Sequence, residues 1–148
     1  MKRFAFTLAA LQRVKEAAKK QQEAALAEAN QKLRALQFHL EGLLAQYAQK
    51  SLEFEEQITN GSDSEHLGHY ANYFDYLRDL IQKTRQDIRA AEKIRDERQL
   101  ALVTTMAELK ALERLYDVQY QEYLMELQKE SDKEMDDFVS YQQTNGGL

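Results

Sequence analysis

The chain has 148 residues, with no proline, no cysteine and only five glycines, and 30% of its residues are charged. Without cysteine it can form neither a disulfide framework nor a thiolate metal site, and its formal net charge of -5 argues against general nucleic-acid binding, which needs a basic face. Because its commonest residues are good helix formers, the composition predicts an all-α protein whose partners are other proteins and not nucleic acid.

The first predicted helix covers residues about 4–58. Its apolar residues recur in alternating steps of three and four, the spacing that keeps one stripe facing a partner helix in a left-handed coiled coil. Between Lys15 and Lys32 the stripe is largely alanine and glutamine, so this part should bury little apolar area and bend easily. The stripe comprises Leu8, Leu11, Ala18, Ala25, Ala29, Leu36, Leu40, Leu43, Tyr47, Phe54 and Ile58.

The chain contains a single cluster of helix-breaking residues, from Thr59 to His66. Asn60-Gly61 can end the first helix, because either residue can adopt the left-handed backbone conformation of a C-cap. Ser62, followed three residues later by Glu65, matches a capping box for the next helix. One break predicts one turn, at residues 59–66, and therefore a long antiparallel two-helix coiled-coil hairpin.

The second predicted helix covers residues about 65–138, and Arg98 interrupts its apolar stripe. Folding back at the turn pairs residues whose numbers sum to about 124, so the chain beyond Leu124 should extend past the first helix as a single helix. Residues 142–148 are predicted to be a flexible tail, which leaves 1–141 as one rod-like domain. The stripe comprises Leu77, Ile81, Thr84, Ile88, Ala91, Leu102, Leu109, Leu112, Tyr116, Tyr123 and Leu127.

The charges along the two helices favour the antiparallel arrangement. In the predicted register a basic N-terminal stretch that includes Arg13 and Lys15 lies beside an acidic stretch that includes Glu108 and Glu113. Each such surface pair is weak, but a parallel dimer would lose all of them. We therefore expect a hairpin that is monomeric when dilute.

The first part of the second helix carries more apolar side chains than one partner helix can cover. They occupy an arc of roughly half the helix circumference. One interpretation is that they fasten the tip of the hairpin, and the other is that part of the arc docks a partner protein. The arc comprises Leu67, Tyr70, Tyr73, Phe74, Tyr76, Leu77, Leu80 and Ile81.

No pattern in the sequence predicts catalysis. His66 and His69, with Asp63 and Glu65 nearby, have a spacing that could hold a metal, but the chain offers no second pair of ligands. His39 reads as a solvated residue. A Gly-rich phosphate loop and a Ser-His-Asp arrangement are both missing from the sequence. We predict a non-enzyme without cofactor or metal.

The N-terminus resembles the start of a signal peptide, because Met1-Lys2-Arg3 precedes a short apolar run that ends at Leu11. That run passes directly into a helical pattern without a small-residue cleavage site. No stretch approaches the roughly 20 apolar residues that a bilayer-spanning helix needs. We expect a cytoplasmic protein that does not insert into the membrane.

Four segments occur along the chain in a characteristic order. They are Phe4-x-Phe6-x-Leu8-x-x-Leu11-x-x-Val14-Lys15, Tyr73-x-x-Tyr76-Leu77-x-x-Leu80, Lys110-x-x-Glu113-x-Leu115 and Lys133-Glu134-Met135-Asp136-Asp137-Phe138. Together they resemble the FliJ family of flagellar export proteins, over almost the whole chain. The resemblance implies an antiparallel coiled coil similar to the central stalk subunit of rotary ATPases.

The resemblance also implies partners. They are the hexameric flagellar export ATPase, the cytoplasmic domain of the membrane protein that forms the export gate, and export chaperones. A protein with these partners would be peripheral at the cytoplasmic face of the inner membrane, held there by the export apparatus.

The resemblance assigns residues to two of these partners. The gate-contact line maps onto Tyr73, Leu77, Leu80 and Thr84, with a companion line on the first helix at Leu36, Leu40, Leu43 and Tyr47. Both lines overlap the predicted seam between the helices. The two chain ends are expected to contact the ATPase ring, through Phe4, Leu8, Leu11, Leu124, Leu127 and Phe138.

Two other functions remain open from the residues alone. The chain could be the stalk of a related secretion or rotary ATPase, or a structural coiled coil that only dimerises.

Overall fold

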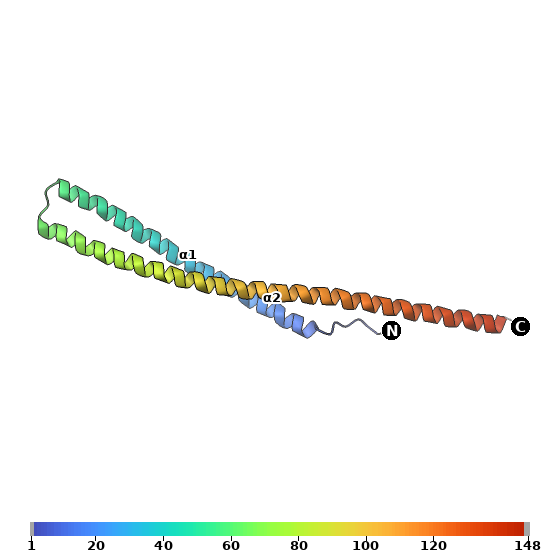
Figure 1. The fold of residues 1–148 in the computed structure, drawn as a ribbon. Helices are drawn as coiled ribbons and strands as arrows, with labels where there is room; N and C mark the ends of the chain where they lie inside the picture. Colours follow the sequence, from blue (N-terminus) through green and yellow to red (C-terminus); the bar gives the residue numbers. More distant parts are fainter. Residues whose placement is uncertain (1, 147–148) are drawn as a thin grey trace. The chain divides into compact units, whose positions relative to one another are not determined.

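The computed structural model describes residues 2–146 and contains two helices in that range, α1 (Ala9–Thr59) and α2 (Ser64–Gly146). The helices run antiparallel, and no strand occurs in the described residues, which confirms the predicted all-α hairpin (Figure 1). Contacts divide the chain into two units. The tip unit consists of residues 21–102, and the terminal unit consists of residues 2–20 together with 103–146.

The end of α1 is fixed by a glycine with positive φ. Gly61 has a φ of 76°, in the left-handed region that favours glycine. Its N–H donates to the Ile58 carbonyl at 3.2 Å, and the Ser62 N–H donates to the Gln57 carbonyl at 3.0 Å. These two bonds form a Schellman motif, which satisfies carbonyls that the helix leaves unpaired. The predicted role of Asn60-Gly61 is confirmed.

The start of α2 differs from the predicted capping box. The Asp63 carboxylate accepts the backbone N–H of His66 at 2.8 Å, so the cap is Asp63 and α2 begins at Ser64. The Ser62 hydroxyl instead donates to the Gln57 side-chain carbonyl at 2.6 Å. Because the Schellman motif holds Ser62 beside α1, the next residue is the one placed to cap α2.

The seam of the tip unit is built from the predicted stripes. Leu43, Leu77 and Ile81 form a buried cluster, and Leu77 retains only 1% of its accessible surface. Thr84 is buried in the same seam. Its hydroxyl donates to the Leu80 carbonyl at 2.8 Å, so this polar group is satisfied within α2. Leu33 is also buried, although the predicted stripe omitted it. It completes the steps of four and three from Ala29 to Leu36.

The register agrees with the predicted pairing in both units. Phe54 packs on Tyr70 in the tip unit, and Phe4 packs on Tyr120 in the terminal unit, and each pair of numbers sums to 124. Lys15 forms an ion pair with Glu108, one of the predicted matches between the basic start of the chain and the acidic part of α2.

The outer ends of the two helices differ from their predicted positions. α1 begins at Ala9 and not near residue 4, because residues 4–8 form a non-helical segment that packs against α2. α2 continues to Gly146, and the Thr144 hydroxyl donates to the Ser140 carbonyl at 2.9 Å within it. Residues 142–146 are therefore part of α2, in the range for which the sequence predicted a flexible tail, and the rest of that range, 147–148, lies outside the described residues.

Candidate partner-binding surfaces

The aromatic residues nearest the turn pack against one another across the two helices. Phe74 is buried, and its ring centroid lies 5.1 Å from that of Tyr47 and 5.7 Å from that of Phe54. Tyr70 lies 5.6 Å from Phe54. Such ring pairs stabilise the contact beyond the area they bury. These four aromatics fasten the tip of the hairpin, as the first of the two interpretations proposed.

Other members of the apolar arc remain accessible on one flank of the tip unit. Tyr73 and Leu80 are half-buried beside the central cluster, and Tyr76 is 58% exposed. The ring centroids of Tyr73 and Tyr76 are 6.2 Å apart. We call Tyr73, Tyr76 and Leu80 the tyrosine flank. Part of the apolar arc therefore fills the seam, and part of it remains accessible to solvent.

The two lines assigned to the export gate do not lie on a common exposed face. Leu77 and Thr84 are buried in the seam, with 1% and 5% of their surfaces exposed. The companion residues are also seam residues: Leu43 is buried, and Leu36, Leu40 and Tyr47 are half-buried. The structure thus brings the two lines together face to face, and only Tyr73 and Leu80 of the principal line reach the surface.

A shallow groove of about 360 Å³ borders the tyrosine flank. Lys50, His66, His69, Tyr70 and Tyr73 line it. The Lys50 ammonium lies 5.5 Å from the centroid of the Tyr73 ring, and its hydrogen bond to Glu53 raises the pKa of the lysine. The described residues contain no group of three or more histidine and carboxylate side chains placed to hold a metal ion.

The N-terminal segment is clasped onto α2 by aromatic rings. The ring centroid of Phe4 lies 5.2 Å from those of Tyr116 and Tyr120 and 5.5 Å from that of Tyr123. The Tyr123 hydroxyl also donates to the Lys2 carbonyl at 2.7 Å. Sequence reasoning missed this clasp, although tyrosines at spacings of four and three along α2 were a signal for it. Phe4, predicted to contact the ATPase ring, is largely engaged within the chain.

The C-terminal part of α2 has no covering segment among the described residues. Every residue from 128 to 146 is exposed. Leu124 is 38% and Phe138 is 57% exposed, whereas Leu127 is half-buried. We call residues 124–146 the acidic segment. Six carboxylates lie in its first fifteen residues, at Glu126, Glu130, Asp132, Glu134, Asp136 and Asp137.

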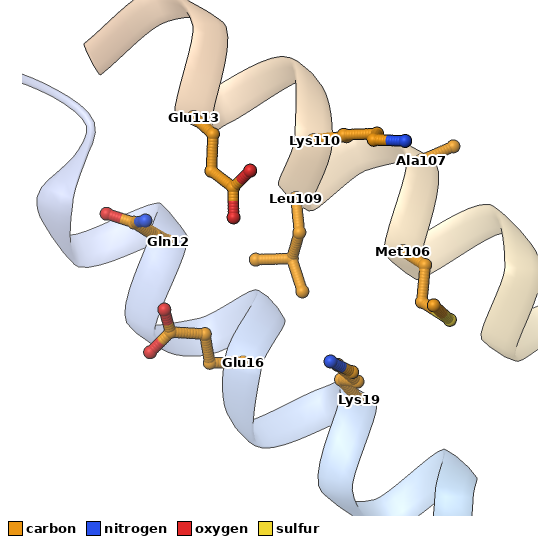
Figure 2. Close-up of a pocket in the computed structure, with 8 residues that line it drawn as sticks. All are labelled: Gln12, Glu16, Lys19, Met106, Ala107, Leu109, Lys110 and Glu113. Carbon is orange, nitrogen blue, oxygen red and sulfur yellow. The ribbon is translucent and has the colours of Figure 1, made fainter. Parts of the chain in front are cut away.

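A second groove, of about 500 Å³, lies between the helices of the terminal unit. In Figure 2, Leu109 of α2 points into the space between the helices, and Gln12, Glu16 and Lys19 project from α1. The lining mixes both signs of charge, because Glu113 and Lys110 border it from α2. This groove therefore shows no preference for a partner of one charge. Of the other residues predicted to contact the ring, Leu8 is half-buried and Leu11 is 43% exposed.

The sequence matches a known protein family. The family described as flagellar FliJ protein matches residues 4–147, nearly the whole chain. The chain belongs to the FliJ family. The proteins of this family are components of the flagellar export apparatus and have a structural or adaptor role.

Two further comparisons, with curated proteins and with solved structures, found no match to this FliJ-family chain. Within residues 2–146, neither helix contains a stretch long and apolar enough to cross a membrane. The match to the FliJ family covers the tyrosine flank, the aromatic clasp and the acidic segment alike.

Proposed function

We propose that this FliJ-family member is a non-enzymatic stalk and adaptor of the flagellar type III export apparatus. It contacts the hexameric export ATPase and the cytoplasmic domain of the export gate, couples the one to the other, and binds export chaperones. It acts in the cytoplasm, at the inner face of the membrane that holds the gate. ATP is bound by the partner and not by this chain.

The observation that carries this proposal is the uncovered acidic segment of α2. A single amphipathic helix is marginally stable alone and is ordered further when a protein surface surrounds it. Leu124 and Phe138 offer apolar contacts, while the carboxylates between them keep the segment soluble when it is free. A helical end of this kind suits insertion into a ring of subunits, as the central stalk of a rotary ATPase inserts into its ring.

The tyrosine flank supports the second contact. Exposed apolar residues rimmed by charge favour protein interfaces, and tyrosine is enriched among residues that anchor them. The flank lies in the tip unit and the acidic segment in the terminal unit, so different parts of the chain serve the two partners. We assign the gate to Tyr73, Tyr76 and Leu80. Leu77 and Thr84 hold these residues in place from within the seam.

The experiment that tests the proposal is reconstitution with the flagellar export ATPase of the same organism. We expect the full chain to bind the ATPase and to increase its assembly into hexamers and its rate of ATP hydrolysis. A chain that neither binds the ATPase nor changes its hydrolysis rate would refute the stalk function. A parallel assay with a related secretion ATPase measures whether the contact is specific to the flagellar system.

A further inference from the structure

The flank of the tip unit opposite the tyrosine flank carries a groove lined by arginines. Successive residues lie about 100° apart around a helix. Tyr73 and Leu80 therefore lie to one side of Leu77. Arg78 and Arg85 lie to the other side, and Arg89 continues their row one turn further. These three arginines border a cavity of about 470 Å³, which we call the arginine groove.

The arginine groove combines an apolar floor with a cationic rim. Leu44 and Tyr47 of α1 and Ile81 of α2 also line it. Leu44 is 41% exposed, so the same cavity offers a partner an apolar side chain as well as the arginines. A surface of this kind favours an amphipathic ligand over a free anion, because a free anion would leave Leu44 uncovered.

The charge of the groove is mostly uncompensated. Arg78 lies 3.3 Å from the Asp75 carboxylate and 3.5 Å from the Tyr47 hydroxyl, and these contacts raise its pKa, with the Tyr47 contact contributing most. No carboxylate of the described residues lies within ion-pair distance of Arg85 or Arg89. Two guanidinium groups are thus available in a chain whose formal net charge is -5. Guanidinium groups pair with carboxylates through two parallel hydrogen bonds.

We propose that the arginine groove binds an acidic, amphipathic helical segment of a partner protein. Its apolar residues pack on Leu44 and Tyr47, and its carboxylates pair with the arginine row. Arg78, Arg85 and Arg89 are spaced by seven and four residues, or about 10 Å and about 6 Å along the axis at 1.5 Å per residue. A helical ligand with carboxylates at the same spacings matches the row.

This inference is independent of the assignment of the gate to the tyrosine flank. The two surfaces lie on opposite flanks of one unit, so two partners can be held there at the same time. Loss of binding at one flank therefore leaves binding at the other intact, and the two proposals fail separately.

The test measures binding of a synthetic fluorescein-labelled peptide to the full chain by fluorescence anisotropy. The peptide is a helix with glutamates spaced by seven and four residues and leucines on the adjoining face. We expect it to bind, and a peptide with lysine in place of each glutamate not to bind. Arg85→Glu and Arg89→Glu should each weaken binding at least tenfold, and Leu44→Ser should weaken it as well.

The matched control is Lys83→Glu, which changes the charge of the same unit by the same amount. Lys83 points away from the arginine row, because it is two residues from Arg85 and therefore about 200° from it around α2. The proposal would be overturned if Lys83→Glu weakened peptide binding as much as Arg85→Glu does. It would also be overturned if the chain bound a DNA oligonucleotide of the same charge as tightly as it binds the peptide. Circular dichroism should show unchanged helix content, since the substituted arginines are exposed.

A second copy of the chain is the competing occupant, because the acidic segment also offers carboxylates and apolar residues. Sedimentation of the full chain at increasing concentration separates the two cases. We expect that any self-association of the chain persists in the Arg85→Glu variant. If such self-association occurs, the groove belongs to a second copy and not to a partner protein.

Discussion

Leu77 of α2 packs in the same buried cluster as Leu43 of α1, with 1% and 5% of their surfaces exposed. Leu80, three residues further along α2, is only half-buried. The two leucines of the Tyr73-x-x-Tyr76-Leu77-x-x-Leu80 segment therefore have different roles. Leu77 is enclosed in the seam, whereas Leu80 packs at its edge and keeps part of its surface accessible.

We predict that Leu77→Ala destabilises the hairpin by about 2–5 kcal/mol, the usual cost of truncating a buried leucine. Tyr76→Ala, at a side chain that is 58% exposed, should change the free energy of unfolding by less than about 0.5 kcal/mol. Urea unfolding followed by circular dichroism measures both. If the two substitutions cost the same, Leu77 is not the centre of the seam.

The gate contact should depend on the tyrosine flank. We predict that the combined change of Tyr73, Tyr76 and Leu80 to alanine weakens binding to the cytoplasmic domain of the gate at least tenfold, or by about 1.4 kcal/mol. Isothermal titration calorimetry with the purified domain measures this affinity. The control is Phe38→Ala, which removes a side chain that is 77% exposed elsewhere in the same unit. Unchanged affinity in a folded triple variant would move the gate contact to another surface.

The acidic segment should be required for the ATPase and not for the gate. A chain truncated after Tyr123 keeps all the aromatic-clasp contacts and the whole tip unit. We predict that it no longer stimulates ATP hydrolysis by the export ATPase, while its affinity for the gate domain is unchanged. Coupled-enzyme ATPase assays and titration with the gate domain give the two readings. Full stimulation by the truncated chain would show that another surface contacts the ring.

The cap of α2 can be tested by two neighbouring substitutions. We predict that Asp63→Ala lowers the free energy of unfolding by about 1 kcal/mol, because the His66 N–H loses its acceptor. Ser62→Ala removes only the bond to the Gln57 side chain and should cost less. Thermal denaturation of both variants ranks them. A larger cost for Ser62→Ala would favour the capping box formed by Ser62 and Glu65.

The sequence by itself determined the helical class, the position of the turn and the register. These features follow from local preferences: the chain has no proline to interrupt either helix, and Gly61 can adopt a positive φ at low cost. The periodic stripe then sets which side of each helix meets the other. Contacts such as Phe54 with Tyr70 and the ion pair of Lys15 with Glu108 follow from that register.

Only the tertiary structure decided how each apolar residue is used. Periodicity locates the centre of an apolar stripe but not its edges. For an arc as wide as that around Leu77, the sequence therefore does not show which side chains the partner helix covers. The start of α1 was also a tertiary outcome, because Phe4 gains three tyrosine rings of α2 by leaving the helix. The cap of α2, by contrast, is a local outcome that the sequence left ambiguous, because Ser62 and Asp63 are both suitable cap residues. The Schellman motif at Gly61 bonds Ser62 back to α1 and leaves Asp63 to accept the His66 N–H.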